Sequence, residues 1–97
     1  MKALDGKEIE NKLANIPGWN YQNDFLEREV QFPSFKEAIS FLNKIADIAE
    51  HINHHPNLTN SYNKLLIQLR THDVQGISQK DFKLAKLINQ LYLETTN

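Results

Sequence analysis

The sequence of 97 residues contains no cysteine, which excludes disulfides, thiol nucleophiles and zinc sites with cysteine ligands. It also contains no apolar run near the roughly 18 residues that a membrane-spanning helix needs. Residues 1–7 do not lead into the apolar segment of a signal peptide. We therefore expect a cytoplasmic protein that does not enter a membrane.

Neither sign of charge is in excess. The chain has 11 Lys and Arg residues and 12 Asp and Glu residues, so its formal net charge is −1. This balance gives no electrostatic basis for binding nucleic acid or an anionic membrane surface. There are 3 glycines in all, and none belongs to a glycine-rich phosphate-binding loop. A small-molecule partner is the expectation, and the sequence identifies no protein partner.

Apolar residues recur at helical spacing in three segments. Each segment follows two residues with the spacing of a capping box, in which side-chain oxygens accept hydrogen bonds from the free backbone N–H groups of the first turn. The pairs are Asp5 with Glu8, Ser34 with Glu37, and Ser78 with Asp81. The first helix ends before Pro17. The second ends near residues 51–54, because Pro56 disfavours helical backbone at His55.

Two hairpins are predicted between the helices. The first turns at Asn23 and Asp24 before a strand over residues 25–32, and the second joins residues 58–62 to residues 64–71. Alternation of apolar and polar side chains supports the strand over residues 64–71 best.

The predicted order is helix, two strands, helix, two strands, helix. It indicates a single α+β domain over residues 1–97, in two layers, with an antiparallel four-stranded sheet covered on one face by three helices. The uncovered face and the sheet edges favour self-association, so we expect a homodimer or homotetramer.

Three of the 4 histidines lie within residues 51–55, where the second helix is expected to end. The second hairpin returns the fourth histidine to them. If Ser61 pairs with Lys64, continuing the register places His72 beside His54. Imidazole exchanges protons near neutral pH, so two imidazoles from different elements can serve as base and acid in an elimination or hydration.

Other interpretations of the histidines stay open at this point. Cationic imidazoles at the C-terminus of a helix interact favourably with its dipole, so the histidines could simply form a polar helix end. A metal site could use His51 with His55, or His54 with His72, although the helix break at Pro56 disturbs the spacing of the first pair. No activated serine or cysteine nucleophile can be placed beside them.

Several short motifs follow one another along the chain. They are Gly18-Trp19, Glu50-x-x-x-His54-His55-Pro56, Tyr62-Asn63-Lys64, Thr71-His72, Gly76-x-Ser78 and Asp81. In order and spacing they resemble the signature of the pterin-4a-carbinolamine dehydratase family, also called dimerization cofactor proteins. The resemblance implies loss of the 4a-hydroxyl from 4a-hydroxytetrahydrobiopterin or a related pterin, in tetrahydrobiopterin recycling. It implies no metal and no organic cofactor.

The resemblance also implies roles for individual residues. His54 and His72 would be the acid/base pair, and His55 would contribute to binding and proton handling. Glu50 would position or polarise a histidine, and Trp19 would pack near the pterin ring, although an aromatic residue next to a turn is commonly part of the core. The remaining residues expected in the substrate site are Asn53, Pro56, Arg70, Thr71 and Asp73, with Asp81 in support, where it also suits the cap of the third helix.

Two positions differ from the expected pattern. His51 lies inside the signature at a position with no special demand, so it is expected on the surface. Arg70 precedes Thr71 where a smaller polar residue is expected, which bears on substrate preference at that edge. Animal members of the family stabilise dimers of a homeodomain transcription factor, so a non-catalytic interaction module is the alternative function. That alternative does not explain why the histidines converge.

Overall fold

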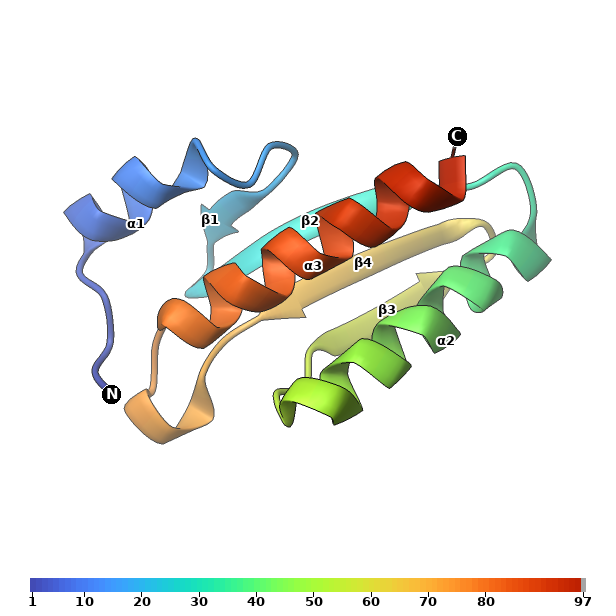
Figure 1. Ribbon diagram of the computed structural model, residues 1–97. Coiled ribbons are helices and arrows are strands. Elements are labelled where there is room, and N and C mark those ends of the chain that lie inside the picture. Colours follow the sequence, from blue (N-terminus) through green and yellow to red (C-terminus); the bar gives the residue numbers. More distant parts are fainter. Residues whose placement is uncertain (97) are drawn as a thin grey trace.

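The computed structural model describes residues 1–96, which alternate between helices and strands (Figure 1). The elements are α1 (Gly6–Leu13), β1 (Asn20–Gln22), β2 (Phe25–Gln31), α2 (Phe35–Ile52), β3 (Asn57–Ser61), β4 (Lys64–Leu69), the short 3-10 helix η1 (His72–Val74) and α3 (Gln79–Thr96). The predicted order of three helices and four strands is confirmed, and η1 is an addition that the sequence pattern did not predict.

The four strands form one antiparallel sheet in the order β1-β2-β4-β3. Helices α2 and α3 lie across one face of this sheet, and α1 lies beside β1 at its end (Figure 1). The result is the predicted two-layer α+β architecture. None of the helices within residues 1–96 is both long enough and apolar enough to cross a membrane.

Helix capping follows the predicted pairs, with one variation. At α1 the Asp5 carboxylate accepts from the Glu8 N–H and the Glu8 carboxylate accepts from the Asp5 N–H, which completes the box. At α3 the Asp81 carboxylate accepts from the Ser78 N–H at 2.9 Å, whereas the Ser78 hydroxyl accepts from the N–H of Lys80. The Asp81 carboxylate therefore caps α3 through Oδ2 alone, and Oδ1 binds a different partner.

Both hairpins turn where the sequence predicts. Asn23 and Asp24 have φ angles of 54° and 67°, as a type I′ turn requires. In the second hairpin Tyr62 takes a positive φ of 53°, and Ser61 pairs with Lys64. The predicted register is therefore confirmed within the ladder.

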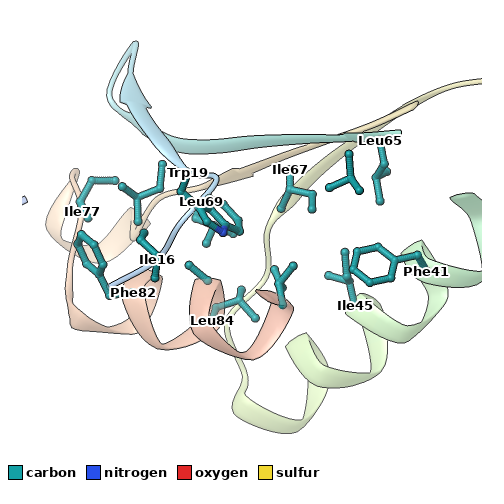
Figure 2. Close-up of a cluster of buried hydrophobic side chains, with 14 of the residues drawn as sticks. Ile16, Trp19, Phe41, Ile45, Leu65, Ile67, Leu69, Ile77, Phe82 and Leu84 are labelled. Carbon is teal, nitrogen blue, oxygen red and sulfur yellow. The ribbon is translucent and has the colours of Figure 1, made fainter. Parts of the chain in front are cut away.

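The hydrophobic core fills the space between the sheet and the helices (Figure 2). On β4, Leu65, Ile67 and Leu69 alternate inward and are fully buried, as predicted. Burial of each such side chain stabilises the fold by about 1.5–3 kcal/mol relative to exposure. Helices α2 and α3 contribute the facing residues, among them Phe41, Ile45, Leu84 and Ile88.

Candidate active site

The end of α2 sends two neighbouring histidines to different partners. Asn53 adopts the left-handed conformation that ends the helix, with φ 54° and ψ 46°. The N–H of His54 then bonds to the carbonyl of Ala49 at 3.0 Å. The chain leaves the helix at the place that Pro56 predicts, and His54 and His55 follow one another in the segment between α2 and β3.

The loop after β4 brings the fourth histidine to this helix end, although not by the predicted path. The strand was expected to reach Thr71, but β4 ends at Leu69 and Thr71 makes only an isolated bridge with Gly76. His72 begins η1, and β3 starts only at Asn57, so no ladder joins His72 to the end of α2. The expected extension of the register is wrong, because the chain turns back at this point to enter η1.

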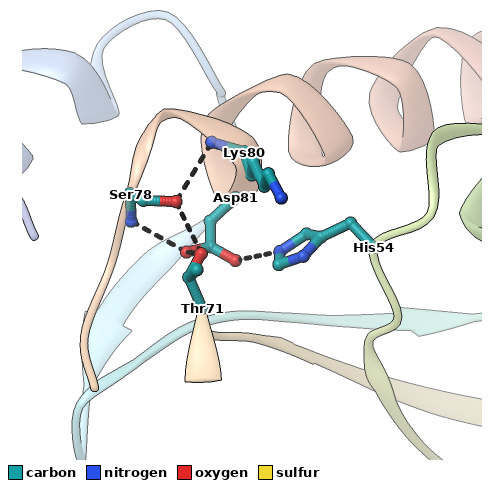
Figure 3. A network of polar contacts seen from close by, with 5 residues as sticks. All are labelled: His54, Thr71, Ser78, Lys80 and Asp81. Atoms are coloured by element: carbon teal, nitrogen blue, oxygen red, sulfur yellow. Dashed lines mark hydrogen bonds and ion pairs between the residues drawn. The ribbon is translucent and has the colours of Figure 1, made fainter. Parts of the chain in front are cut away.

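A buried carboxylate at the start of α3 holds His54 in place (Figure 3). Asp81 is 0% exposed, and its Oδ1 lies 2.6 Å from Nε2 of His54. Its Oδ2 accepts from the hydroxyl of Thr71 at 2.7 Å and from the N–H of Ser78 at 2.9 Å. A buried carboxylate is costly unless donors surround it, and here both oxygens are occupied.

The same network sets the direction of each hydrogen bond. Because the single hydroxyl proton of Thr71 points to Asp81, the Ser78 hydroxyl must donate to Thr71 Oγ1, which lies 2.6 Å away. Asp81 acts as the acceptor throughout, so His54 donates from Nε2. In a neutral imidazole this leaves Nδ1 as the unprotonated nitrogen.

His55 has a separate carboxylate partner on the surface. Its Nε2 is hydrogen-bonded to Oε2 of Glu50, and the two side chains are 59% and 75% exposed. Glu50 thus makes the contact that its expected positioning role requires.

Two adjoining hollows lie beside these histidines. The first, of about 220 Å³, opens on the uncovered face of the sheet and is lined by Phe25, His55, Asn57, Gln68, Arg70 and His72. The second, of about 300 Å³, is lined by Asn53, His54, His55, Arg70, Thr71, His72, Asp73 and Lys80. They share His55, Arg70 and His72, so together they can hold one small molecule.

Most of the residues expected in the site line these hollows, but Trp19, Glu50, Pro56 and Asp81 do not. Trp19 is 5% exposed within the hydrophobic core, and its Nε1 donates to Oδ1 of Asn89 at 2.7 Å. Trp19 lines neither hollow, because the indole fills the core and its N–H already has a partner, and its expected packing against the pterin ring stays a prediction. Pro56 is half-buried and lines neither hollow, so it acts only through the turn. His51 is exposed, as expected.

Sequence reasoning missed several lining residues. Phe25, Asn57, Gln68 and Lys80 line the hollows but were not singled out as site residues. The register held a signal for two of them, since Asn57 pairs with Gln68 at the end of the ladder next to the histidines.

Within the described part of the chain, no three His, Asp or Glu side chains are grouped as metal ligands.

Comparisons with known proteins find relatives over nearly the whole chain. The sequence matches the family model described as pterin 4 alpha carbinolamine dehydratase over residues 2–91. A candidate pterin-4-alpha-carbinolamine dehydratase of Sulfurisphaera tokodaii is 45% identical over 91 residues, which cover 94% of this chain and 98% of the relative. A second candidate, from Thermosynechococcus vestitus, is 47% identical over 90 residues, or 93% and 95% of the two chains.

Solved structures share the fold. A transcriptional coactivator/pterin dehydratase of Brucella melitensis superposes with a TM-score of 0.88 and 29% identity, covering 93% of this chain and 98% of the other. A pterin dehydratase-like RuBisCO assembly factor of the α-carboxysome gives a TM-score of 0.66 at 21% identity, covering 76% and 88%. With its sequence, its fold and its histidine-lined hollows in agreement, the chain belongs to the pterin-4-alpha-carbinolamine dehydratase family.

Proposed function

We propose that the protein removes water from a 4a-hydroxytetrahydropterin, such as 4a-hydroxytetrahydrobiopterin, and so serves tetrahydropterin recycling. The observation that carries the proposal is the convergence of His54, His55 and His72 on adjoining hollows, with His54 held by a buried carboxylate. Family membership supplies the substrate class. A purely structural cluster of histidines has no need of such hollows.

The proposed reaction needs only proton transfers. A base removes the proton from N5, the electrons form a double bond between N5 and C4a, and the C4a–O bond breaks as an acid protonates the leaving hydroxyl. The products are the quinonoid dihydropterin and water. Atoms and electrons balance without an oxidant, so the proposed step requires neither a metal nor an organic cofactor.

The hydrogen bonds suggest which histidine is the base. Because Nε2 of His54 donates to Asp81, its Nδ1 holds a lone pair, and the nearby carboxylate stabilises the imidazolium that forms. His72 is exposed and can recover its proton from solvent, which suits the acid. His55, which is hydrogen-bonded to Glu50 and lines both hollows, would contribute to binding and proton handling.

The direct test is the decay of chemically prepared 4a-hydroxytetrahydrobiopterin, followed by absorbance. His54→Ala and His72→Ala should each lower the catalysed rate by about 10²–10⁴-fold, the usual contribution of a positioned acid or base. His51→Ala, at an exposed position in the last turn of α2, is the matched control and should keep the wild-type rate. Equal, background-level decay in all of these folded proteins would reject the dehydratase.

The relative from Brucella melitensis, described as a coactivator as well as a dehydratase, favours an interaction module as the second candidate. In that case the exposed faces of α2 and α3 would bind a partner, and the histidines would be dispensable. A binding partner captured equally well by wild type and His54→Ala, with no dehydratase activity in either, would support it.

We also propose that the protein forms a homodimer or homotetramer. The sheet has one uncovered face, and the outer edge of β3 has no neighbouring strand among the described residues. Sedimentation at micromolar concentration should give a mass above that of the monomer. A monomeric mass would contradict this proposal without affecting the reaction.

A further inference from the structure

Arg70 is an uncompensated cation at the junction of the two hollows. Its Nη2 donates to the carbonyl of Gln75 at 2.9 Å, which ties it to the loop after η1. Its Nε is the one buried side-chain nitrogen or oxygen in the described chain that has no hydrogen-bond partner. Among residues 1–96, no carboxylate lies within ion-pair distance of the guanidinium.

This arrangement is costly without a ligand. Arginine stays charged at all ordinary pH values, and a buried N–H without an acceptor loses the full free energy of its hydration. Most buried donors in proteins do have partners, so an exception calls for an explanation. An acceptor that enters the hollow with a ligand would supply the missing hydrogen bond.

The walls of the hollows favour an anionic acceptor. Apart from the histidines, Arg70 is the only charged side chain that lines the first hollow, where its neighbours are uncharged. Lys80 adds a cation to the second hollow, and Asp73 adds its only carboxylate. Glu27 accepts from the Gln68 amide but lines neither hollow. A guanidinium with free N–H groups is well suited to the oxygens of a phosphate or carboxylate.

We propose that Arg70 determines substrate specificity by binding an anionic group, a phosphate or a carboxylate, on the side chain of the pterin. The inference rests on the proposed function, because the substrate would be a 4a-hydroxytetrahydropterin with a charged side chain. A neutral dihydroxypropyl side chain, as in tetrahydrobiopterin, leaves the guanidinium without its acceptor. Arg70 is thus a specificity residue, and the histidines carry the chemistry.

The kinetic test compares kcat/KM for 4a-hydroxy derivatives with a neutral, a phosphorylated and a glutamate-bearing side chain. The wild type should prefer an anionic substrate by about 10- to 100-fold, the usual worth of a hydrogen bond to a charged group. Arg70→Gln should bring this preference close to one, and Arg70→Lys should restore part of it. Lys83→Gln removes the same charge from α3 outside both hollows and should leave the preference unchanged. The two anionic substrates distinguish phosphate from carboxylate.

Equilibrium binding separates this inference from the dehydratase itself. The probes are the stable, fluorescent oxidised pterins biopterin, neopterin monophosphate and folic acid, titrated with wild type, Arg70→Gln and Lys83→Gln. Tighter binding of an anionic probe that is lost only in Arg70→Gln would support the site even if no turnover occurs. Equal wild-type affinity for neutral and anionic probes would overturn the inference. So would an equal loss for all probes in Arg70→Gln, which would reduce Arg70 to a support for the loop at Gln75.

Discussion

The imidazole of His54 and the carboxylate of Asp81 lie 2.6 Å apart, from Nε2 to Oδ1, although 27 positions separate them in the sequence. His54 directly follows the residue that ends α2, and Asp81 lies in the first turn of α3, so the contact ties together the two helices that cover the sheet. It also fixes which nitrogen of His54 bears the proton, because the carboxylate accepts. This contact therefore links the stability of the fold to the proposed chemistry.

Asp81→Asn should remove the carboxylate acceptor from His54 while preserving the size of the side chain. An amide can donate to His54 and so favour the other tautomer, which removes the lone pair from Nδ1. We expect kcat to fall by about 100-fold or more. The melting temperature should also fall, because the Thr71 hydroxyl and the Ser78 N–H lose a charged acceptor. Saturation kinetics and thermal unfolding measure the two effects. Asp47→Asn, on the exposed side of α2, should change neither.

Glu50→Gln should change the stability of the fold very little and kcat measurably. The pair with His55 is well exposed, and exposed ion pairs contribute little, so the free energy of unfolding should change by less than about 0.5 kcal/mol. His55 loses the carboxylate that orients it, and we expect a decrease in kcat of about tenfold or less, smaller than for Asp81→Asn. Glu10→Gln, an exposed change in α1, serves as the control. A larger loss for Glu50→Gln than for Asp81→Asn would assign the main base to His55.

Asn89→Ala should destabilise the fold without a direct effect on the site. Oδ1 of Asn89 accepts from Trp19 at 2.7 Å and from Nη1 of Arg28 at 2.5 Å, and its Nδ2 donates to the Pro17 carbonyl. Burial already lowers the pKa of Arg28, so loss of an acceptor adds to the cost of that cation. We expect a loss of about 1–3 kcal/mol in urea unfolding. Asn43→Ala, at an exposed position on α2, should change the free energy of unfolding by close to zero. A collapse of kcat per folded molecule would show that Trp19 acts in the site as well as in the core.

Gly18→Ala should destabilise the fold for two reasons, a backbone conformation that alanine disfavours and a steric clash with Arg28. Gly18 has a φ of 91°, and an added Cβ would lie 2.9 Å from Cζ of Arg28. We expect a loss of about 1–3 kcal/mol in the free energy of unfolding. Gly6→Ala is the contrast, because nothing lies within 4 Å of its added Cβ at the start of α1. That change should be neutral or stabilising by up to about 1 kcal/mol. Similar losses for both would contradict the argument.

Local features of the sequence predicted most of the fold because their physics is local. The capping pair of Asp5 and Glu8, and the positive-φ turn at Asn23 and Asp24, act within a few residues. The end of β4 was not predictable in this way. Apolar alternation extends to Leu69. The reversal of the chain that leads into η1 depends on the bridge between Thr71 and Gly76, and the periodicity of the sequence does not predict this bridge.

The sequence by itself determined where the histidines cluster and which faces of the strands are buried. Side chains alternate along a strand, and Pro56 disfavours helix before it, whatever surrounds them. Only the tertiary structure decided the partners: His54 meets a buried Asp81, its neighbour His55 meets an exposed Glu50, and Trp19 turns into the core. These outcomes depend on how the end of α2 packs against the start of α3, and packing between distant segments leaves no periodic trace in the chain.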